Sequence, residues 1–143
     1  MDGLSLPGLC QYVAPTEFGE SIAAVARRLR PGGWFVFDLH TDAMMQFTLA
    51  NPVVHGEADG QRFVIESIVD AAARTCDTHV EITRVSDGDT FSERHRQYFH
   101  SDADVRRALA DAGLALLAVT DEYTDASVDE ASLRATWVAR RDG

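Results

Sequence analysis

The sequence predicts an α/β fold with an inserted antiparallel sheet of three strands, from the following observations. Residues 34–39 form an apolar, aromatic run with little alternation, which is typical of a strand that helices cover on both faces. In residues 78–85 apolar and polar side chains alternate, as they do in a half-exposed strand. Helical patterns precede and follow both kinds of strand. We therefore expect one domain over residues 1–143, with the inserted sheet at about residues 61–99.

The composition is that of a globular protein with an acidic surface. Of 143 residues, 13 are Lys or Arg and 23 are Asp or Glu, which gives a net charge of −10. This balance excludes a nucleic-acid partner, because binding to phosphate backbones needs a basic surface. No apolar run is long enough to span a bilayer, and residues 1–7 lack the features of a secretion signal. Since Cys10 and Cys76 lie far apart, we expect free thiols, a cytoplasmic location and no membrane partner.

The first predicted helix follows a loop. Pro7 and Gly8 interrupt any period in residues 1–13, so this segment is expected to be a loop with short apolar pieces. Thr16 can cap a helix with a single apolar stripe, and the Pro-Gly-Gly turn at residues 31–33 ends it. The stripe consists of Phe18, Ile22, Val25, Ala26 and Leu29.

A second helix and the inserted sheet follow the apolar strand. Thr41 and Asp42 can cap a helix over residues 43–50. Asp87 and Gly88 predict a hairpin turn, because both residue types tolerate the positive φ angles of a tight turn. The inserted strands are predicted at residues 62–69, 78–85 and 90–99.

The chain is expected to close on a helix and a hairpin. Ser101 can cap a helix that Gly113 ends. The apolar runs at residues 114–120 and 133–139 are separated only by an acidic loop at residues 121–130. Two strands joined by a loop alone pair in antiparallel fashion, so one of them runs against the direction of the main sheet.

Several segments resemble class I S-adenosylmethionine-dependent methyltransferases. Residues 29–33 (LRPGG), with the apolar strand and Asp38 after them, are similar to the family's helix, turn and strand after its fourth strand. Residues 95–99 (HRQYF) and 112–114 (AGL) are similar to the lead-in to its penultimate helix and sixth strand, and residues 9–12 (LCQY) to the segment after its fourth strand. The resemblance implies a partial Rossmann-like methyltransferase sheet, with strands equivalent to 5, 6 and 7, in an enzyme of the small-molecule type that carries an inserted antiparallel sheet.

The sequence departs from this family in its glycines. It has no G-x-G-x-x-G or G-x-G-x-G motif, and Gly32 and Gly33 follow a helix rather than a strand. Such a motif brings backbone N–H groups to the cofactor at a helix N-terminus. The resemblance implies S-adenosylmethionine as cofactor, yet no cofactor-binding residue can be named, and we do not expect this chain alone to bind it. We expect the C-terminal half, truncated or split, of an enzyme that methylates a small molecule.

Partners and alternatives follow from the same departure. Strand 34–39 would lack its neighbour on one edge, and an open apolar edge pairs readily with another chain. Besides a small-molecule substrate we therefore expect a homodimer, or a complementary N-terminal half in trans. The alternatives are a non-catalytic binding or dimerisation module that keeps the substrate-side half, and an unrelated α/β enzyme without a cofactor. Whether the chain is an active enzyme stays open.

Candidate site residues lie after strand 34–39 and on the inserted sheet. Asp38 and His40 stand where an open α/β sheet presents ligands, and His40 is the candidate catalytic base; a structural loop histidine is the alternative. The resemblance implies that the inserted sheet roofs the substrate, so that Arg96 or Tyr98 contacts it; a solvated sheet face is the alternative. Tyr12 is a further substrate-binding candidate, or else a packing residue. No metal site is predicted, because the histidines lack a ligand spacing.

Overall fold

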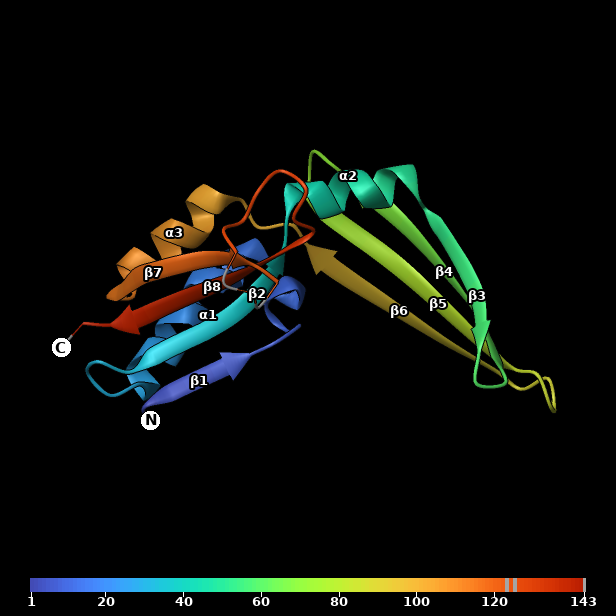
Figure 1. Ribbon diagram of the computed structural model, residues 1–143, viewed down its shortest axis with the longest axis horizontal. Helices are drawn as coiled ribbons and strands as arrows, with labels where there is room; N and C mark the ends of the chain where they lie inside the picture. Colours follow the sequence, from blue (N-terminus) through green and yellow to red (C-terminus); the bar gives the residue numbers. More distant parts are fainter. Residues whose placement is uncertain (123, 125, 143) are drawn as a thin grey trace.

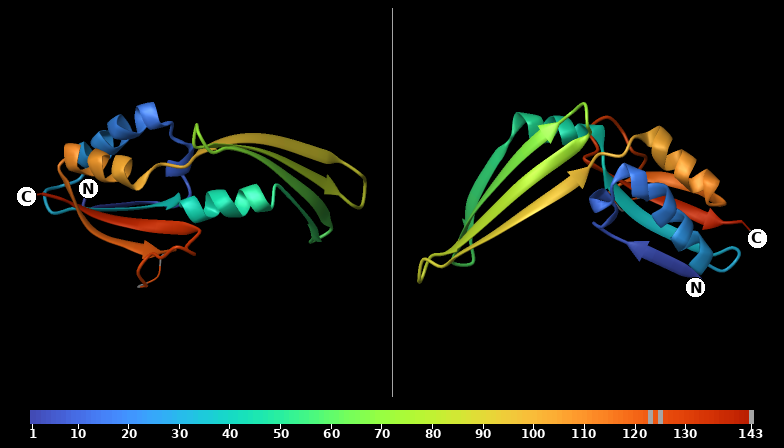
Figure 2. Two further views of the ribbon diagram at one scale, coloured as in Figure 1. Left: turned by 90° about the horizontal axis from the view of Figure 1, so that it is seen from above. Right: turned by 180° about the vertical axis from the view of Figure 1, so that it is seen from behind.

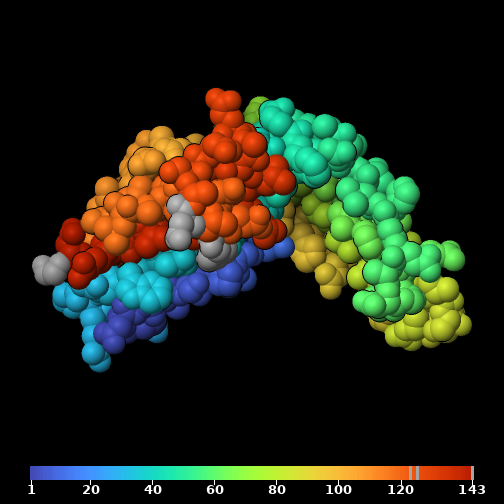
Figure 3. Space-filling model, viewed as in Figure 1, coloured from blue at the N-terminus to red at the C-terminus, as the bar shows by residue number. Residues whose placement is uncertain are grey.

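The computed structural model consists of two four-stranded sheets, in the orders β1-β2-β8-β7 and β3-β4-β5-β6 (Figure 1). It describes residues 1–122, 124 and 126–142. The second sheet extends from the first as an arm, and the outline of the molecule is hollowed between them (Figure 3). The elements are β1 (Gly3–Leu6), η1 (Cys10–Tyr12), α1 (Pro15–Arg28), β2 (Trp34–His40), α2 (Asp42–Ala50), β3 (Val53–Ala58), β4 (Gln61–Asp70), β5 (Thr75–Arg84), β6 (Thr90–Tyr98), α3 (Asp102–Asp111), β7 (Leu114–Asp121) and β8 (Arg134–Arg141).

The core lies between the first sheet and the helices α1 and α3, which cover the same face (Figure 2). Phe35 and Phe37 on β2 are fully buried there, and their rings stack at 4.8 Å. Trp34 and Val36 alternate with them and point to the opposite face, where Trp34 is 48% exposed. No helix of the described ranges covers that face, so the expectation of helices on both faces of this strand is wrong. The run is apolar on both faces although only one of them packs in the core.

Part of residues 1–13 is a strand and not the predicted loop. β1 pairs in parallel with β2, from Gly3 opposite Trp34 to Leu6 opposite Phe37. Gly3 permits this approach, because a Cβ atom there would lie 2.6 Å from the Trp34 ring. A strand of four residues that begins on glycine is too short to show a period, which is why the sequence does not reveal it. The prediction that β2 has an open edge is therefore wrong, because β1 pairs with that edge.

The inserted sheet has four strands, not three, and begins at Val53 rather than near residue 61. β3 pairs with β4 in antiparallel fashion up to Ala58 opposite Gln61, around the turn Asp59-Gly60. Both turn residues have positive φ angles, 51° and 74°, as a two-residue hairpin turn requires. An Asp-Gly pair was thus the signal for this strand, and the mostly exposed, glycine-containing sequence of β3 hid it.

The remaining predictions of structure largely hold. Thr41 and Ser101 cap α2 and α3 through hydrogen bonds of 3.2 Å from the backbone N–H groups of Met44 and Asp104. β7 and β8 form the predicted antiparallel hairpin. The predicted cap Thr16 is wrong, because α1 already begins at Pro15, with Ala14 as N-cap. No helix of the described residues is long and apolar enough to cross a membrane.

Replacement of Phe37 by alanine should lower the free energy of unfolding by about 3–5 kcal/mol, because a fully buried aromatic side chain leaves a cavity. Ile68→Ala is the matched control: Ile68 is 75% exposed, and its loss should change stability by less than about 0.5 kcal/mol. Urea denaturation followed by circular dichroism measures both. Equal losses would contradict the assignment of the core to the first sheet.

Candidate functional site

A cavity of 460 Å³ lies where the two sheets meet, and we call it the inter-sheet cavity. One side is formed by η1 and the carboxyl end of β2, and the other by α2 and the inner face of the arm. Its polar lining includes uncharged groups of Thr48, Ser67, Thr78 and Gln97 among apolar side chains. A concave, largely apolar surface with a few placed polar groups is typical of small-molecule sites. The complete lining is Tyr12, His40, Met44, Thr48, Ile65, Ser67, Cys76, Thr78, Val80, His95, Gln97, Phe99 and Arg134.

His40, the last residue of β2, brings a neutral imidazole to this cavity. Burial, together with the positive charge of Arg134, lowers the pKa of His40 to about 4, while Asp38 opposes the shift. Its Nε2 atom is buried and has no hydrogen-bond partner among the described residues. A neutral ring with an unsatisfied nitrogen can exchange a hydrogen bond or a proton with a bound molecule.

Tyr12 reaches the same cavity because Asp38 holds the preceding loop. The backbone N–H of Gly8 donates to both carboxylate oxygens of Asp38, at 3.0 and 3.1 Å. η1 follows and places the Tyr12 hydroxyl 3.1 Å from the side-chain amide of Gln97, which donates to it. The Tyr12 ring meets the His95 ring edge-on, at 5.9 Å between centroids. Asp38 itself is buried and does not line the cavity, so its place is behind the site.

Arg96 and Tyr98 lie outside the lining of the inter-sheet cavity. Successive side chains of a strand point to opposite faces, and on β6 His95 and Gln97 take the inner face. Arg96 is directed to the other face and forms two hydrogen bonds with Asp77, at 2.7 and 2.8 Å. This exposed ion pair raises the pKa of Arg96 and lowers that of Asp77.

The sequence alone does not mark Gln97, His95, Thr78 and Cys76 as site residues, although all of them line the cavity. The alternation along β5 and β6 assigns these residues to one face. It does not tell which face turns toward β2, because that depends on how the arm meets the first sheet. Tyr12 and His40 lie far apart in the sequence, and both line this cavity.

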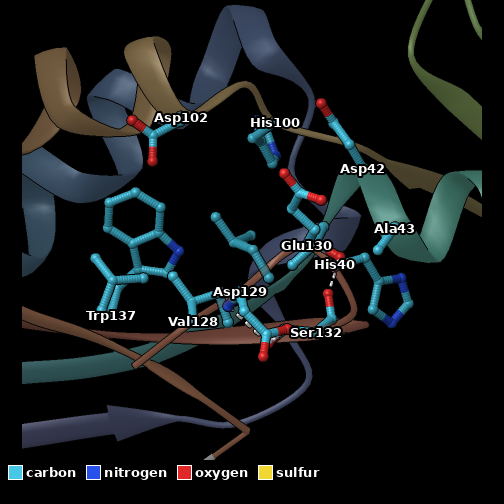
Figure 4. Close-up of a pocket in the computed structure, with 14 residues that line it drawn as sticks. His40, Asp42, Ala43, His100, Asp102, Val128, Asp129, Glu130, Ser132 and Trp137 are labelled. Atoms are coloured by element: carbon cyan, nitrogen blue, oxygen red, sulfur yellow. Dashed lines mark hydrogen bonds between the residues drawn. The ribbon is translucent and has the colours of Figure 1, made fainter. Parts of the chain in front are cut away.

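A second cavity, of 340 Å³, lies on the side of the β7–β8 connection, and we call it the loop-side cavity (Figure 4). Trp137 and Val128 form part of its apolar wall. Four carboxylates line it, those of Asp42, Asp102, Asp129 and Glu130. The hydroxyl of Thr41 donates to the Ser132 carbonyl and ties α2 to this connection. The two cavities therefore differ in charge.

The described residues form neither a metal centre nor a place for S-adenosylmethionine. They contain no group of three or more His, Cys, Asp or Glu side chains that could hold a metal ion. Gly8 follows a parallel strand, but its N–H already donates to Asp38, and Pro15 at the start of α1 has no N–H to offer. The connection from β1 to α1 thus builds no cradle of free backbone N–H groups, and in this respect it does not fit the cofactor.

Solved structures of known proteins share this architecture. No protein-family model and no curated protein match the sequence. A solved S-adenosylmethionine-dependent methyltransferase from Clostridium acetobutylicum superimposes with a TM-score of 0.89 at 20% identity, over 100% of this chain and 59% of that chain. The chain has the fold of S-adenosylmethionine-dependent methyltransferases. The CcbJ methyltransferase from Streptomyces caelestis matches with a TM-score of 0.82 at 20% identity, over 99% of this chain and 57% of that one.

A third structure gives the same result. The sugar N-methyltransferase KedS8 from Streptoalloteichus matches with a TM-score of 0.72 at 21% identity, over 100% of this chain and 57% of its own. The chain thus spans 57–59% of the length of these methyltransferases. The predicted methyltransferase-like α/β fold is confirmed, whereas the equivalence of its strands to the family's strands 5, 6 and 7 stays a prediction.

The depressed pKa of His40 predicts a loss of stability in acid. Between about pH 6.5 and pH 4 the unfolded chain binds a proton at His40 that the folded chain does not, so the free energy of unfolding falls as the pH falls. His40→Gln should remove about 2 kcal/mol of this fall. His100, whose pKa burial also lowers, keeps part of it. Urea denaturation at pH 4.5 and 7 measures the difference.

His55→Gln serves as the control, because His55 is exposed on β3. This variant should keep the full pH dependence of the wild type. A His40→Gln variant with an unchanged fall in stability would show that His40 is protonated in the folded chain at low pH.

Proposed function

We propose that this chain supplies the substrate-binding side of an S-adenosylmethionine-dependent methyltransferase that acts on a small molecule. The observation that carries the proposal is the inter-sheet cavity, with the neutral ring of His40 at the end of β2. The carboxyl end of a strand in an open α/β sheet is where such folds bind ligands. A methyl acceptor bound there would contact Tyr12 and the inner face of the arm, which line the cavity together.

The chain's own residues would prepare the acceptor. The nucleophile of a methyl transfer has to be oriented, and an acceptor O–H or N–H group has to lose its proton. His40 is our candidate to take that proton, because its ring lines the cavity and its buried Nε2 atom has no other hydrogen-bond partner among the described residues. Gln97 and Tyr12, which are hydrogen-bonded to each other, would position the acceptor, and the apolar side chains around them exclude water.

The methyl donor has to be held by residues outside this chain, because the described residues do not fit S-adenosylmethionine. We propose a complementary polypeptide in trans for this role, or a second copy of the chain as a dimer partner. The proposal is supported by the uncovered face of the first sheet, where the large apolar side chain of Trp34 is half-exposed.

The isolated chain should not bind S-adenosylmethionine. Without a cradle of backbone N–H groups, the cofactor would lose most of the contacts that fix it in nucleotide-type sites. Isothermal titration calorimetry with up to millimolar cofactor should give heats of dilution only. A micromolar isotherm would mean that the described residues hold the cofactor in a way that the fold does not suggest.

Methyl transfer tests the function directly. The tagged chain is purified from its own host together with its partner, and transfer of the labelled methyl group of S-adenosylmethionine to small molecules of the same host is measured. His40→Ala should lower kcat/KM by about 10²-fold, the usual effect of removing a general base, while cofactor binding by the complex is unchanged. His55→Ala, on the exposed β3 strand, should leave the rate as it is.

A complex that binds the cofactor but transfers no methyl group to any small molecule would contradict the proposal and leave a binding module. An unchanged rate in His40→Ala would remove His40 from the chemistry.

A further inference from the structure

The inter-sheet cavity differs in charge from the rest of this acidic protein. The chain has 23 acidic and 13 basic residues, yet among the described residues no Asp or Glu lines this cavity. Of the described lining residues, Arg134 alone has a permanent charge. The loop-side cavity, by contrast, is lined by four carboxylates. A negatively charged molecule would therefore be repelled by the loop-side cavity and attracted by the inter-sheet cavity.

Arg134 stands directly beside the candidate base. It is the cross-strand partner of His40 between β2 and β8, so both side chains project from the same face of the sheet. Its charge acts on the imidazole and contributes to the lowered pKa of His40. A group bound to Arg134 would thus lie beside the His40 ring.

Among the described residues, the guanidinium of Arg134 is only loosely engaged. Its ion pair is with the exposed Glu122, at 3.8 Å between Nη1 and Oε1, which is beyond hydrogen-bond distance. Arg96, for comparison, grips Asp77 with two hydrogen bonds of 2.7 and 2.8 Å. Because a guanidinium has five N–H donors in a fork that matches an oxyanion, Arg134 keeps the capacity for a two-point contact with a ligand.

Resting on the proposed function, we propose that the acceptor is an anionic small molecule whose carboxylate or phosphate is bound by Arg134 beside His40. Its ring or apolar part would pack against Tyr12, His95 and Phe99, which supply the aromatic surface of the cavity. The hydroxyls of Thr48, Ser67 and Thr78 would meet uncharged polar groups of the same molecule. The lining disfavours a cationic molecule, because none of the described residues that line the cavity carries a carboxylate.

Four probes with the same phenyl ring test the charge: benzoate, phenyl phosphate, benzamide and benzylamine. Binding to the whole chain is measured by NMR titration at low ionic strength, with the shifts of His40 and Gln97 resonances as markers of the cavity. Benzoate or phenyl phosphate should bind about tenfold more tightly than benzamide, and benzylamine most weakly. The tighter of the two anions identifies the oxyanion as a carboxylate or a phosphate.

Variants of Arg134 assign the effect to this side chain. Arg134→Gln should weaken binding of the preferred anion about tenfold and leave benzamide binding unchanged, whereas Arg134→Lys should restore part of the loss. Arg96→Gln is the matched control, since it removes an exposed guanidinium from the other face of the arm and should have no effect. Circular dichroism checks that all three variants are folded.

The outcomes separate this inference from the function on which it rests. If no probe shifts the cavity resonances, the cavity is not a small-molecule site and both proposals fail. If benzylamine binds as tightly as the anions, or Arg134→Gln binds them like the wild type, the anionic acceptor is overturned while the substrate site stands.

Discussion

The hydrogen bonds from the Gly8 backbone to the Asp38 carboxylate fix the geometry on which the candidate site depends. Asp38 is 2% exposed, and a buried carboxylate is tolerated only where donors satisfy it. The bonds tie the loop after β1 to the end of β2. They therefore decide where η1 lies, and with it where Tyr12 meets Gln97 on the arm. Asp38, a candidate substrate contact because of its position near the end of this strand, thus holds the loop that leads to Tyr12.

The arm packs against α2, which follows β2 of the first sheet, through a small core of its own formed by Met45, Cys76 and Phe99. Arg74 reinforces this junction: its side chain donates to the Phe99 carbonyl at 2.6 Å, and its backbone carbonyl accepts the Phe99 N–H at 2.8 Å. The same side chain pairs with Asp42 at the start of α2, at 2.5 Å. Since the inter-sheet cavity takes walls from both sheets, these contacts set its width as well as holding the arm.

Local signals in the sequence predict local structure well in this chain. Thr41 and Ser101 cap the helices that they were expected to cap, and the apolar stripe of α1 packs as its spacing indicates. The sequence does not predict β1, because this four-residue strand is stabilised by its pairing with β2 and has no pattern of its own. The sequence does not predict β3, because apolar and polar residues alternate clearly only in the segment after its Asp-Gly turn and not in the segment before it.

The site was harder to predict than the fold, for a physical reason. Period two assigns His95 and Gln97 to one face of β6 and Arg96 and Tyr98 to the other, but both faces carry polar residues that suit a ligand. Only the junction of the two sheets determines which face is enclosed. The sequence does not point to Arg134 either, because its importance comes from its cross-strand partner His40, which lies far away in the sequence.

The pairing of Arg134 with His40 connects recognition of the acceptor with its activation. Burial and the charge of Arg134 together hold the pKa of His40 at about 4, which makes the imidazole a reluctant proton acceptor. An anion bound to the guanidinium would offset this positive charge at close range, and the pKa of His40 would rise in response. A neutral or cationic molecule would not produce this change. The charge that selects the acceptor would thereby also prepare the base that deprotonates it, so that binding and chemistry would depend on one cross-strand pair.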